Sequence, residues 1–222
     1  MLMLFMVAVL AGRGFEAVDA EMKEQAEQRD RPVVVIDAGH GGVDPGKVGV
    51  NQALEKDINL KIAEKLKVFL EAADVEVILT REGDSGLYKE TDGNKKIADM
   101  KARCQVIEKS GADIVVSVHQ NSYHEGSVRG PQVFYYTHSE EGKELAEAVQ
   151  DGFSGLLGEQ NTRPAKGNTD YYLFLHVKQP IVIVECGFLS NREEAENLTD
   201  ETYQEKVAWV IHLGVLKYLN AG

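Results

Sequence analysis

The sequence predicts a single α/β domain in which a twisted, mostly parallel sheet carries helices on both faces. Three observations predict this fold class. Short runs of β-branched residues alternate along the chain with amphipathic segments, which is the pattern of βαβ units. Apolar runs such as VVVI and IVIV are typical of buried strands. The 222 residues, 43% of them hydrophobic, are sufficient for one sizeable core and require no second globular module.

The first βαβ unit is predicted in residues 32–80. PVVVIDA at 32–38 is a buried strand, and VEVILT at 75–80 is the next strand. The segment between them is predicted to be an amphipathic helix over residues 55–73, because apolar residues recur along one helical stripe: Ile58, Ile62, Leu66, Phe69 and Leu70.

The alternation continues to the C-terminus. Six further elements are expected: a helix from about Asn94 to Glu108, strands at 113–120 and 132–137, a helix from Glu140 to about Leu157, a strand at 181–187 and a closing amphipathic helix at 202–219. Strands that alternate with helices in this way favour a mostly parallel sheet that is covered on both faces.

The first 30 residues are expected to lie outside this domain. About ten apolar residues in a row near the N-terminus are fewer than the roughly 20 that a helix needs to span a bilayer. AVDA after them is similar to the cleavage region of a secretory signal, although the usual Lys or Arg before the apolar run is missing. The charged stretch EMKEQAEQRDR then indicates a linker or a frayed helix. We therefore predict a signal-like or anchor-like segment with a linker at 1–30, followed by one domain at 31–222.

Charge and cysteine content argue against a nucleic-acid-binding protein and against a disulfide-stabilised protein. The formal net charge of −12 gives little electrostatic attraction toward nucleic acid phosphates, so no nucleic acid partner is expected. Cys104 and Cys186 are too few for a disulfide framework and neither belongs to a CxxC pair, so both are expected to be free and buried.

Four residues capable of acid/base or ligand chemistry converge by topology. His40 follows the first predicted strand, while His119 and Glu185 close two other strands. Glu55 begins the helix that follows the first strand, and it therefore starts on the same edge of the sheet. In open α/β sheets the carboxyl ends of the strands form the edge that carries the site.

Two neutral imidazoles and one carboxylate match the zinc ligands of hydrolases, in which a fourth position stays open for water. The glycines of AGHGGVDPG would let the backbone fold tightly beside the metal. Other interpretations remain open at this point: a His after a Gly-rich turn is often a solvated loop residue, and a Glu at a helix start often serves the helix dipole. Glu185 in IVIVECG favours a functional role more strongly, because a buried carboxylate is costly unless it is paired or metal-linked.

Five motifs in order make the chain similar to the zinc-dependent N-acetylmuramoyl-L-alanine amidases of the Amidase_3 family. They are IDAGHGGVDPG, EKDINL, LTREGD, SVHQN and VECGFLSN, and the resemblance extends over residues 33 to about 220. It implies that His40, Glu55 and His119 bind Zn²⁺, that Glu185 is the catalytic carboxylate and that residues 31–222 form the catalytic domain. The implied reaction is hydrolysis of the amide bond between the lactyl group of N-acetylmuramic acid and the L-alanine of the peptidoglycan stem peptide.

Further residues receive secondary roles on this interpretation. Arg129 would help to stabilise the developing oxyanion as a second catalytic residue, and Asp37 would orient His40 or cap the loop. Segment 163–174 (RPAKGNTDYYLF) would line the substrate groove, with simple packing as the alternative. One departure from the family pattern is that Arg103 is followed four and five residues later by Ile107 and Glu108 rather than by Ala-Asn. The implied zinc ligands are unaffected, but the resemblance does not extend to fine substrate selection.

Three segments are most similar to the germination-specific, spore-cortex members of the family in spore-forming Firmicutes: LYKETDGNKKIADMKAR, GNTDYYLFL and YQEKVAWVIHLGVLKYL. This resemblance implies action outside the cytoplasmic membrane, in the forespore intermembrane space or spore cortex, during formation of muramic-δ-lactam. The sequence contains no cell-wall-binding repeat. Delivery to peptidoglycan is therefore expected to depend on the N-terminal segment or on a partner such as a sporulation lipoprotein that activates the enzyme.

Two alternatives belong to other functional classes. A zinc peptidase or other amidohydrolase would use the same ligands on a different amide bond. A catalytically silent cell-wall-binding regulator would keep the fold, but such a protein would be expected to lose the metal ligands or the base, and all four residues are present here.

Overall fold

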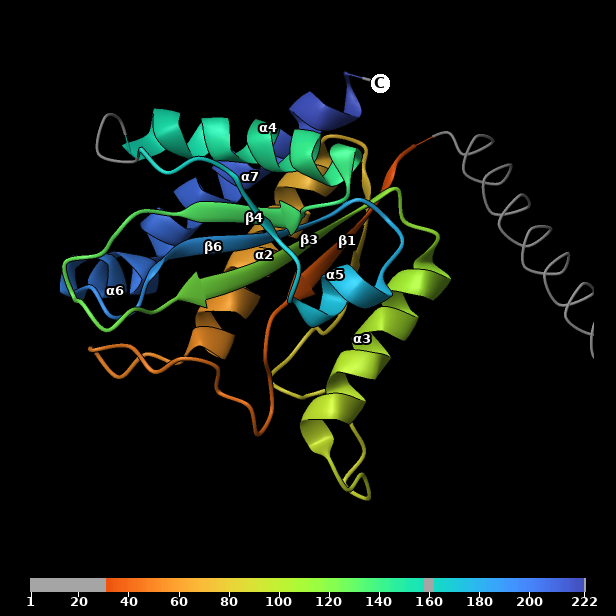
Figure 1. Ribbon diagram of the computed structural model, residues 1–222, viewed down its shortest axis with the longest axis horizontal. Coiled ribbons are helices and arrows are strands. Elements are labelled where there is room, and N and C mark those ends of the chain that lie inside the picture. The colour runs from red at the N-terminus through yellow and green to blue at the C-terminus, as the bar shows by residue number, and fades with distance from the viewer. Residues whose placement is uncertain (1–30, 158–161, 222) are drawn as a thin grey trace, which may run out of the picture.

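Six strands form one sheet in the order β2-β1-β3-β6-β4-β5 in the computed structural model, which describes residues 31–157 and 162–221 (Figure 1). Their bounds are β1 Val33–Ala38, β2 Glu76–Leu79, β3 Ile114–Asn121, β4 Gln132–Tyr136, β5 Lys166–Asn168 and β6 Ile181–Phe188. Neighbouring strands pair in parallel except for β4 and β6, which are antiparallel. The predicted mostly parallel sheet is confirmed.

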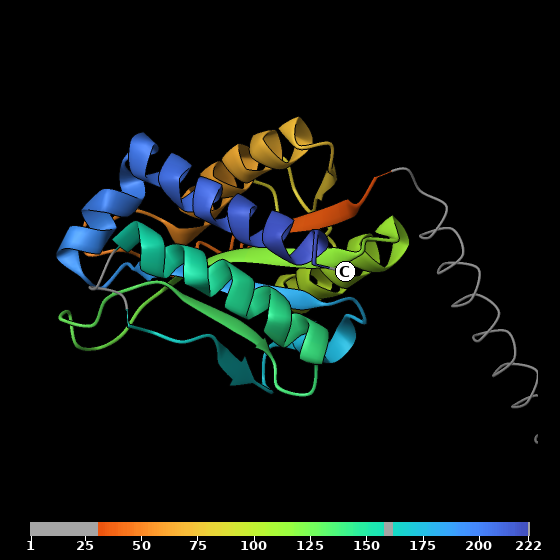
Figure 2. The ribbon, with the colours of Figure 1, turned by 90° about the horizontal axis from the view of Figure 1, so that it is seen from above.

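Helices cover both faces of this sheet, as expected. Their bounds are α2 Glu55–Ala72, α3 Lys95–Ser110, α4 Glu140–Leu157, α5 Tyr172–His176, α6 Arg192–Thr199 and α7 Glu201–Leu219. Figure 2 shows α2, α7 and α4 side by side over one face, and α3 and α5 lie on the other face in Figure 1. In the described part of the chain no helix is both long enough and apolar enough to cross a bilayer.

The alternation of side chains along the central strands produces two cores. Even-numbered residues of β1, β3 and β6, such as Ile36, Val116 and Val184, pack with α2, α4 and α7. Odd-numbered residues such as Val35, Val115 and Ile183 pack on the other face, with Ile107 of α3 and Leu173 of α5. Because successive strand residues point to opposite faces, this parity also decides which polar side chains can meet.

Three short elements were not predicted: β5, α5 and α6. Each has eight residues or fewer, too few for a periodic pattern to be distinctive. Helix α6 does have a local signal, because the Asn191 side chain accepts a hydrogen bond from Glu194 N and so caps the helix. Both cysteines are free, as expected, but only Cys186 is buried, while Cys104 is partly exposed. The expected signal or anchor segment at 1–30 lies outside the described residues.

Candidate metal centre

The polar ends of three central strands meet on the face that α3 and α5 cover. His119 of β3 pairs in register with Glu185 of β6, and Asp37 of β1 pairs with Ser117 of β3. All four residues are odd-numbered, so they point to the same side as the odd-numbered apolar residues earlier in each strand. This face is therefore apolar toward the amino ends of the strands and polar at their carboxyl ends.

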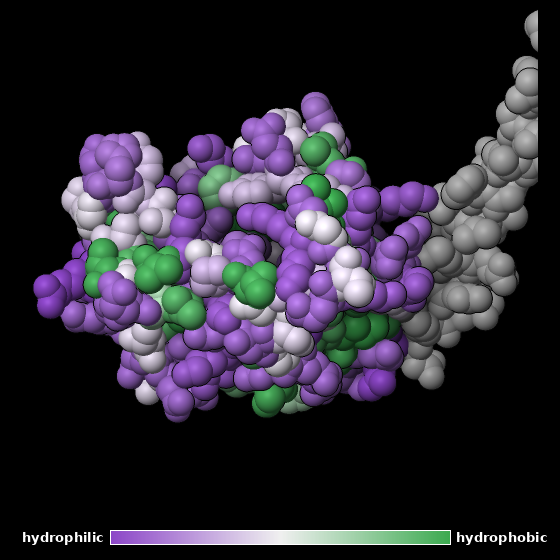
Figure 3. Space-filling view, turned by 90° about the horizontal axis from the view of Figure 1, so that it is seen from below, coloured by the Kyte–Doolittle hydropathy of each residue, from purple (hydrophilic) through white to green (hydrophobic). Residues whose placement is uncertain are grey.

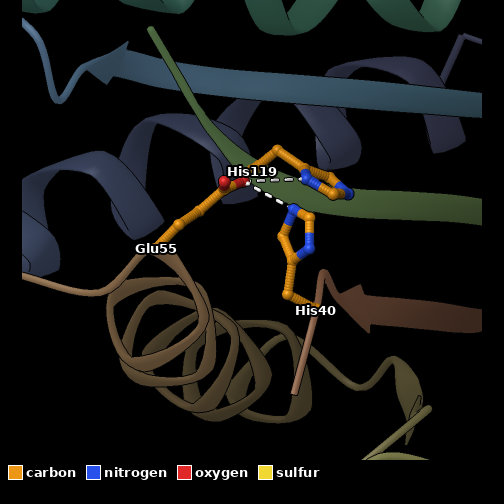
Figure 4. Close-up of side chains that lie close together, drawn as sticks. All are labelled: His40, Glu55 and His119. Carbon is orange, nitrogen blue, oxygen red and sulfur yellow. Dashed lines mark hydrogen bonds and ion pairs between the residues drawn. The ribbon is translucent and has the colours of Figure 1, made fainter. Parts of the chain in front are cut away.

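His40, Glu55 and His119 lie together at this edge (Figure 4). The side chain of Glu55 extends from the start of α2, and its Oε1 lies 3.2 Å from His40 Nε2 and 3.0 Å from His119 Nδ1. One ligand atom from each of the three residues lies within 4.8 Å of the others. Imidazole nitrogens and a carboxylate oxygen at this spacing fit a zinc ion of the catalytic type, which has three protein ligands and an open position.

Glu55 is held as an anion. Burial raises the pKa of its carboxyl group, but hydrogen bonds and charge interactions with His119 and His40 outweigh burial and bring the pKa far below its usual range. Backbone N–H groups reinforce this state, because Lys47 N donates to Oε2 at 2.7 Å and Gln120 N donates to Oε1 at 3.0 Å. For His119, burial lowers the pKa and the hydrogen bond with Glu55 raises it, with a net rise.

The loop between β1 and α2 brings His40 to the site through an unusual backbone conformation. His40 has a φ of 62°, in the left-handed region that non-glycine residues rarely adopt. Two glycines permit close approach: a Cβ at Gly39 would collide with the His119 ring, and a Cβ at Gly46 would lie 2.5 Å from Glu55 Oε2. The Gly-rich motif after β1 therefore makes room for the ligand side chains.

The His40 ring is oriented by Asp44 rather than by Asp37. Asp44 Oδ2 lies 3.1 Å from His40 Nδ1, which leaves Nε2 to face Glu55. The buried Asp37 carboxylate instead accepts hydrogen bonds from Thr80, Ser117 and Arg103 at 2.6 to 2.8 Å. Sequence reasoning missed Asp44, although its spacing of four residues from His40 in HGGVD was visible.

Glu185 lies in the same cavity and has the environment of a proton acceptor. Its side chain is buried, and burial raises its pKa to about 7 despite the opposing effect of His119. Oε1 is 3.4 Å from the Tyr171 hydroxyl, whereas the buried Oε2 has no hydrogen-bond partner among the described residues. A buried oxygen without a partner is costly, so this atom fits a role toward water, a metal or a substrate.

Arg129 is the one sequence-predicted site residue that the structure does not bring to this group. It lies in the loop between β3 and β4, where its Nη1 lies 3.0 Å from Glu193 Oε2 at the start of α6. It is absent from the described residues that line the cavity, and its predicted contact with an oxyanion stays a prediction.

A cavity of about 670 Å³ extends from the metal centre between α3 and α5. Its walls include Tyr171, Tyr172 and Leu173 from the segment that the sequence placed at a groove. Sequence reasoning missed the opposite wall, which comes from Tyr88 and from Lys96 and Met100 of α3. Figure 3, seen from the side opposite to Figure 2, shows a mostly hydrophilic surface with small, separate hydrophobic patches.

The chain matches known proteins over most of its length. Residues 34–217 match the family model described as Amidase_3, N-acetylmuramoyl-L-alanine amidase. A germination-specific N-acetylmuramoyl-L-alanine amidase from Bacillus subtilis is 38% identical over 189 residues, which cover 84% of this chain and 79% of the relative. The amidase LytC from the same organism is 31% identical, covering 87% of this chain but 37% of LytC.

A solved structure is also similar over nearly the whole described domain. It is the CwlD amidase from Clostridioides difficile in complex with the GerS lipoprotein, with 41% identity and a TM-score of 0.84. The match covers 86% of this chain and 100% of that chain.

Proposed function

Since this chain belongs to the Amidase_3 family of zinc-dependent N-acetylmuramoyl-L-alanine amidases, which act on peptidoglycan, we propose that His40, Glu55 and His119 are its zinc ligands and that Glu185 is its catalytic carboxylate. The observation that carries the proposal is the convergence of three ligand side chains within 4.8 Å beside a buried carboxylate whose Oε2 has no partner among the described residues. The catalytic domain on this proposal is residues 31–222.

The residues divide the reaction between them. Zinc, when bound, supplies a Lewis acid that polarises the scissile carbonyl and makes water more acidic. Glu55 stays ionised as a ligand, and Asp44 fixes the ring of His40. Glu185, with a pKa raised to about 7, accepts a proton from the attacking water and then donates it to the leaving L-alanine nitrogen. A carboxyl group that is near its pKa at neutral pH can perform both transfers.

Product and metal analysis of the purified chain test this proposal together. We expect near-stoichiometric zinc and, after digestion of purified peptidoglycan, a new free amino group on L-alanine with the lactyl group left on the sugar. A metal-free protein with full hydrolytic activity would contradict the proposed zinc-ligand role of these residues. Release of any other amine of the stem peptide would show that the same metal centre belongs to a peptidase rather than to this amidase.

We further propose that the biological substrate is spore cortex peptidoglycan, from which stem peptides are removed before muramic-δ-lactam forms. The germination-specific relative and the similarity to CwlD support this finer assignment. The measurement is the muramic-δ-lactam content of cortex from spores that lack the gene. Normal muramic-δ-lactam in those spores would contradict the assignment.

A sporulation lipoprotein is the proposed partner, because the similar CwlD structure contains the GerS lipoprotein. The proposed location is extracytoplasmic, in the forespore intermembrane space or cortex, with residues 1–30 as the signal or anchor. A partner that binds only the zinc-loaded form would raise zinc affinity by linkage. Zinc titration of the chain with and without the lipoprotein encoded in the same organism checks this, and identical titration curves would exclude the linkage.

A further inference from the structure

Three consecutive carbonyl oxygens, beginning at the last residue of β1, receive hydrogen bonds from two guanidinium groups. Arg81, which follows β2, donates from Nε to Ala38 O at 2.9 Å and from Nη2 to Gly39 O at 3.2 Å. Arg103, in the middle of α3, donates from Nη1 to Ala38 O at 2.8 Å and from Nη2 to His40 O at 2.5 Å. The backbone turn that carries His40 is therefore hydrogen-bonded to two arginine side chains.

The guanidinium of Arg103 is itself fixed. The side chain is only 1% exposed, its Nε donates to Asp99 Oδ2 at 2.6 Å, and its Nη1 donates to Asp37 Oδ1 at 2.6 Å. Asp37 is in turn held by hydroxyl groups from Thr80 of the neighbouring segment and Ser117 of β3. A planar fork with partners on three of its nitrogens has one orientation, so it can act as a rigid support.

The supported backbone is strained. A left-handed conformation is unfavourable for a residue with a Cβ, and it persists only where the surroundings determine it. His40 has this conformation at a φ of 62°, and the hydrogen bond from Arg103 ends on its own carbonyl oxygen. Without that bond, a relaxed backbone at residue 40 would turn the imidazole away from Glu55.

We propose that Arg103 is a positioning residue for the metal centre, which holds the His40 backbone in its left-handed conformation and thereby aims His40 Nε2 at Glu55. This inference rests on the metal role proposed above for His40, Glu55 and His119. The competing explanation is that Arg103 only stabilises the fold. The two differ in one measurable quantity, because a purely stabilising residue leaves the zinc affinity of folded molecules unchanged.

The test is the zinc dissociation constant of Arg103→Lys, measured by chelator competition at a temperature where circular dichroism shows a fully folded protein. Lysine keeps a positive charge but lacks the fork, so it cannot bind His40 O and Ala38 O together with both carboxylates. We expect the dissociation constant to rise roughly 10- to 100-fold, as for other residues that support a metal ligand. Leu145→Ala is the control, since Leu145 is fully buried in α4 and does not line the cavity. It should lower the melting temperature and leave zinc affinity unchanged.

Each outcome decides between the explanations. Unchanged zinc affinity in folded Arg103→Lys, or an equal loss in Leu145→Ala, overturns the inference while the proposed zinc site stands. A wild-type chain without zinc affinity overturns the proposed site itself. If Arg103→Lys does not fold, Asp99→Asn replaces it, because this change keeps the acceptor for Leu87 N but removes the anion that fixes Arg103 Nε. A smaller rise in the dissociation constant is then expected, and no rise overturns the inference.

Discussion

At the scale of single residues, similar side chains have different pKa values because their surroundings differ. Glu55 and Glu185 are both buried glutamates of the metal centre. Burial raises the pKa of Glu55, but hydrogen bonds and charge interactions with two imidazoles outweigh burial and lower it, and two backbone N–H groups also donate to the carboxylate. Glu185 is buried between β3 and β4, and burial raises its pKa to about 7 although His119 and the Tyr171 hydroxyl act in the opposite direction. Two carboxyl groups with pKa values driven apart in this way are suited to ligand and proton-transfer roles respectively.

The first prediction separates these two glutamates. Glu55→Gln replaces a charged oxygen ligand with a weaker neutral one, so zinc affinity and activity should fall together. Glu185→Gln keeps the size of the side chain but removes the basic oxygen, so zinc should stay bound while turnover falls roughly 10²- to 10⁴-fold. Zinc content, melting temperature and amide hydrolysis are measured on both variants. A folded, zinc-loaded Glu185→Gln protein with wild-type turnover would remove the proposed base.

The second prediction concerns the contact between Gly39 and His119. A methyl group at Gly39 would overlap the His119 ring, so Gly39→Ala should displace the imidazole and weaken zinc binding at least about tenfold. Gly93→Ala is the matched control, because a Cβ there meets no atom within 4 Å. Chelator competition on the two variants gives the answer. Equal zinc affinity in both would show that the His119 position tolerates this crowding.

At the scale of elements, the short helix α6 fixes the loop that follows β3. Its residue Glu194 is buried and accepts hydrogen bonds from Gly130 N in that loop and from Phe188 N at the end of β6. Its cap, Asn191, also donates to Gly126 O of the loop at 2.8 Å. Helix α6 therefore connects the carboxyl ends of β3 and β6 on the edge that carries the metal centre.

The third prediction follows from this cap. Asn191→Ala removes the capping bond to Glu194 N together with the bond to Gly126 O, so the free energy of unfolding should fall by about 2 kcal/mol. Asn94→Ala at α3 is the matched control, since the Asn94 side chain provides the cap bond to Ile97 N and lies exposed. Its loss should be about 1 kcal/mol or less. Urea unfolding of both variants is the measurement, and equal losses would show that the loop contact contributes nothing.

At the scale of the whole molecule, stability is linked to acid titration through the buried ion network. Burial raises the pKa of Asp37, but Arg103 and the hydrogen bond from Ser117 outweigh burial and lower the pKa to about 2. A carboxyl group whose pKa is lower in the folded than in the unfolded chain stabilises the fold at pH values above its unfolded pKa of about 3.9. That contribution is lost as the pH falls toward 2.

The fourth prediction gives this linkage a magnitude. A pKa lowered by about two units corresponds to about 2 to 3 kcal/mol of stability that disappears between about pH 5 and pH 2. Asp37→Asn cannot titrate, so its unfolding free energy should fall less with acid than that of the wild type, by up to that amount. Denaturant unfolding of both metal-free proteins between pH 5 and pH 2.5 measures the difference. Parallel pH curves for the two proteins would contradict the lowered pKa.

The sequence by itself determined the fold class and the long elements, and it predicted the four residues of the proposed site. Periodicity is a local property, so every predicted strand and helix occurs within a few residues of its expected bounds. The carboxyl-end rule for parallel sheets predicts that His40, His119 and Glu185 lie at one edge.

Tertiary structure alone decided which polar groups pair across the domain. Asp37 meets Arg103, 66 residues away, and Arg129 pairs with Glu193 instead of reaching the cavity. The left-handed backbone of His40 was also not predicted, and its carbonyl oxygen accepts a hydrogen bond from Arg103 of α3, a contact that no local sequence pattern indicates. Hydrogen-bond partners are selected by direction and distance in the folded chain, and these are fixed only when the sheet and its covering helices have assembled.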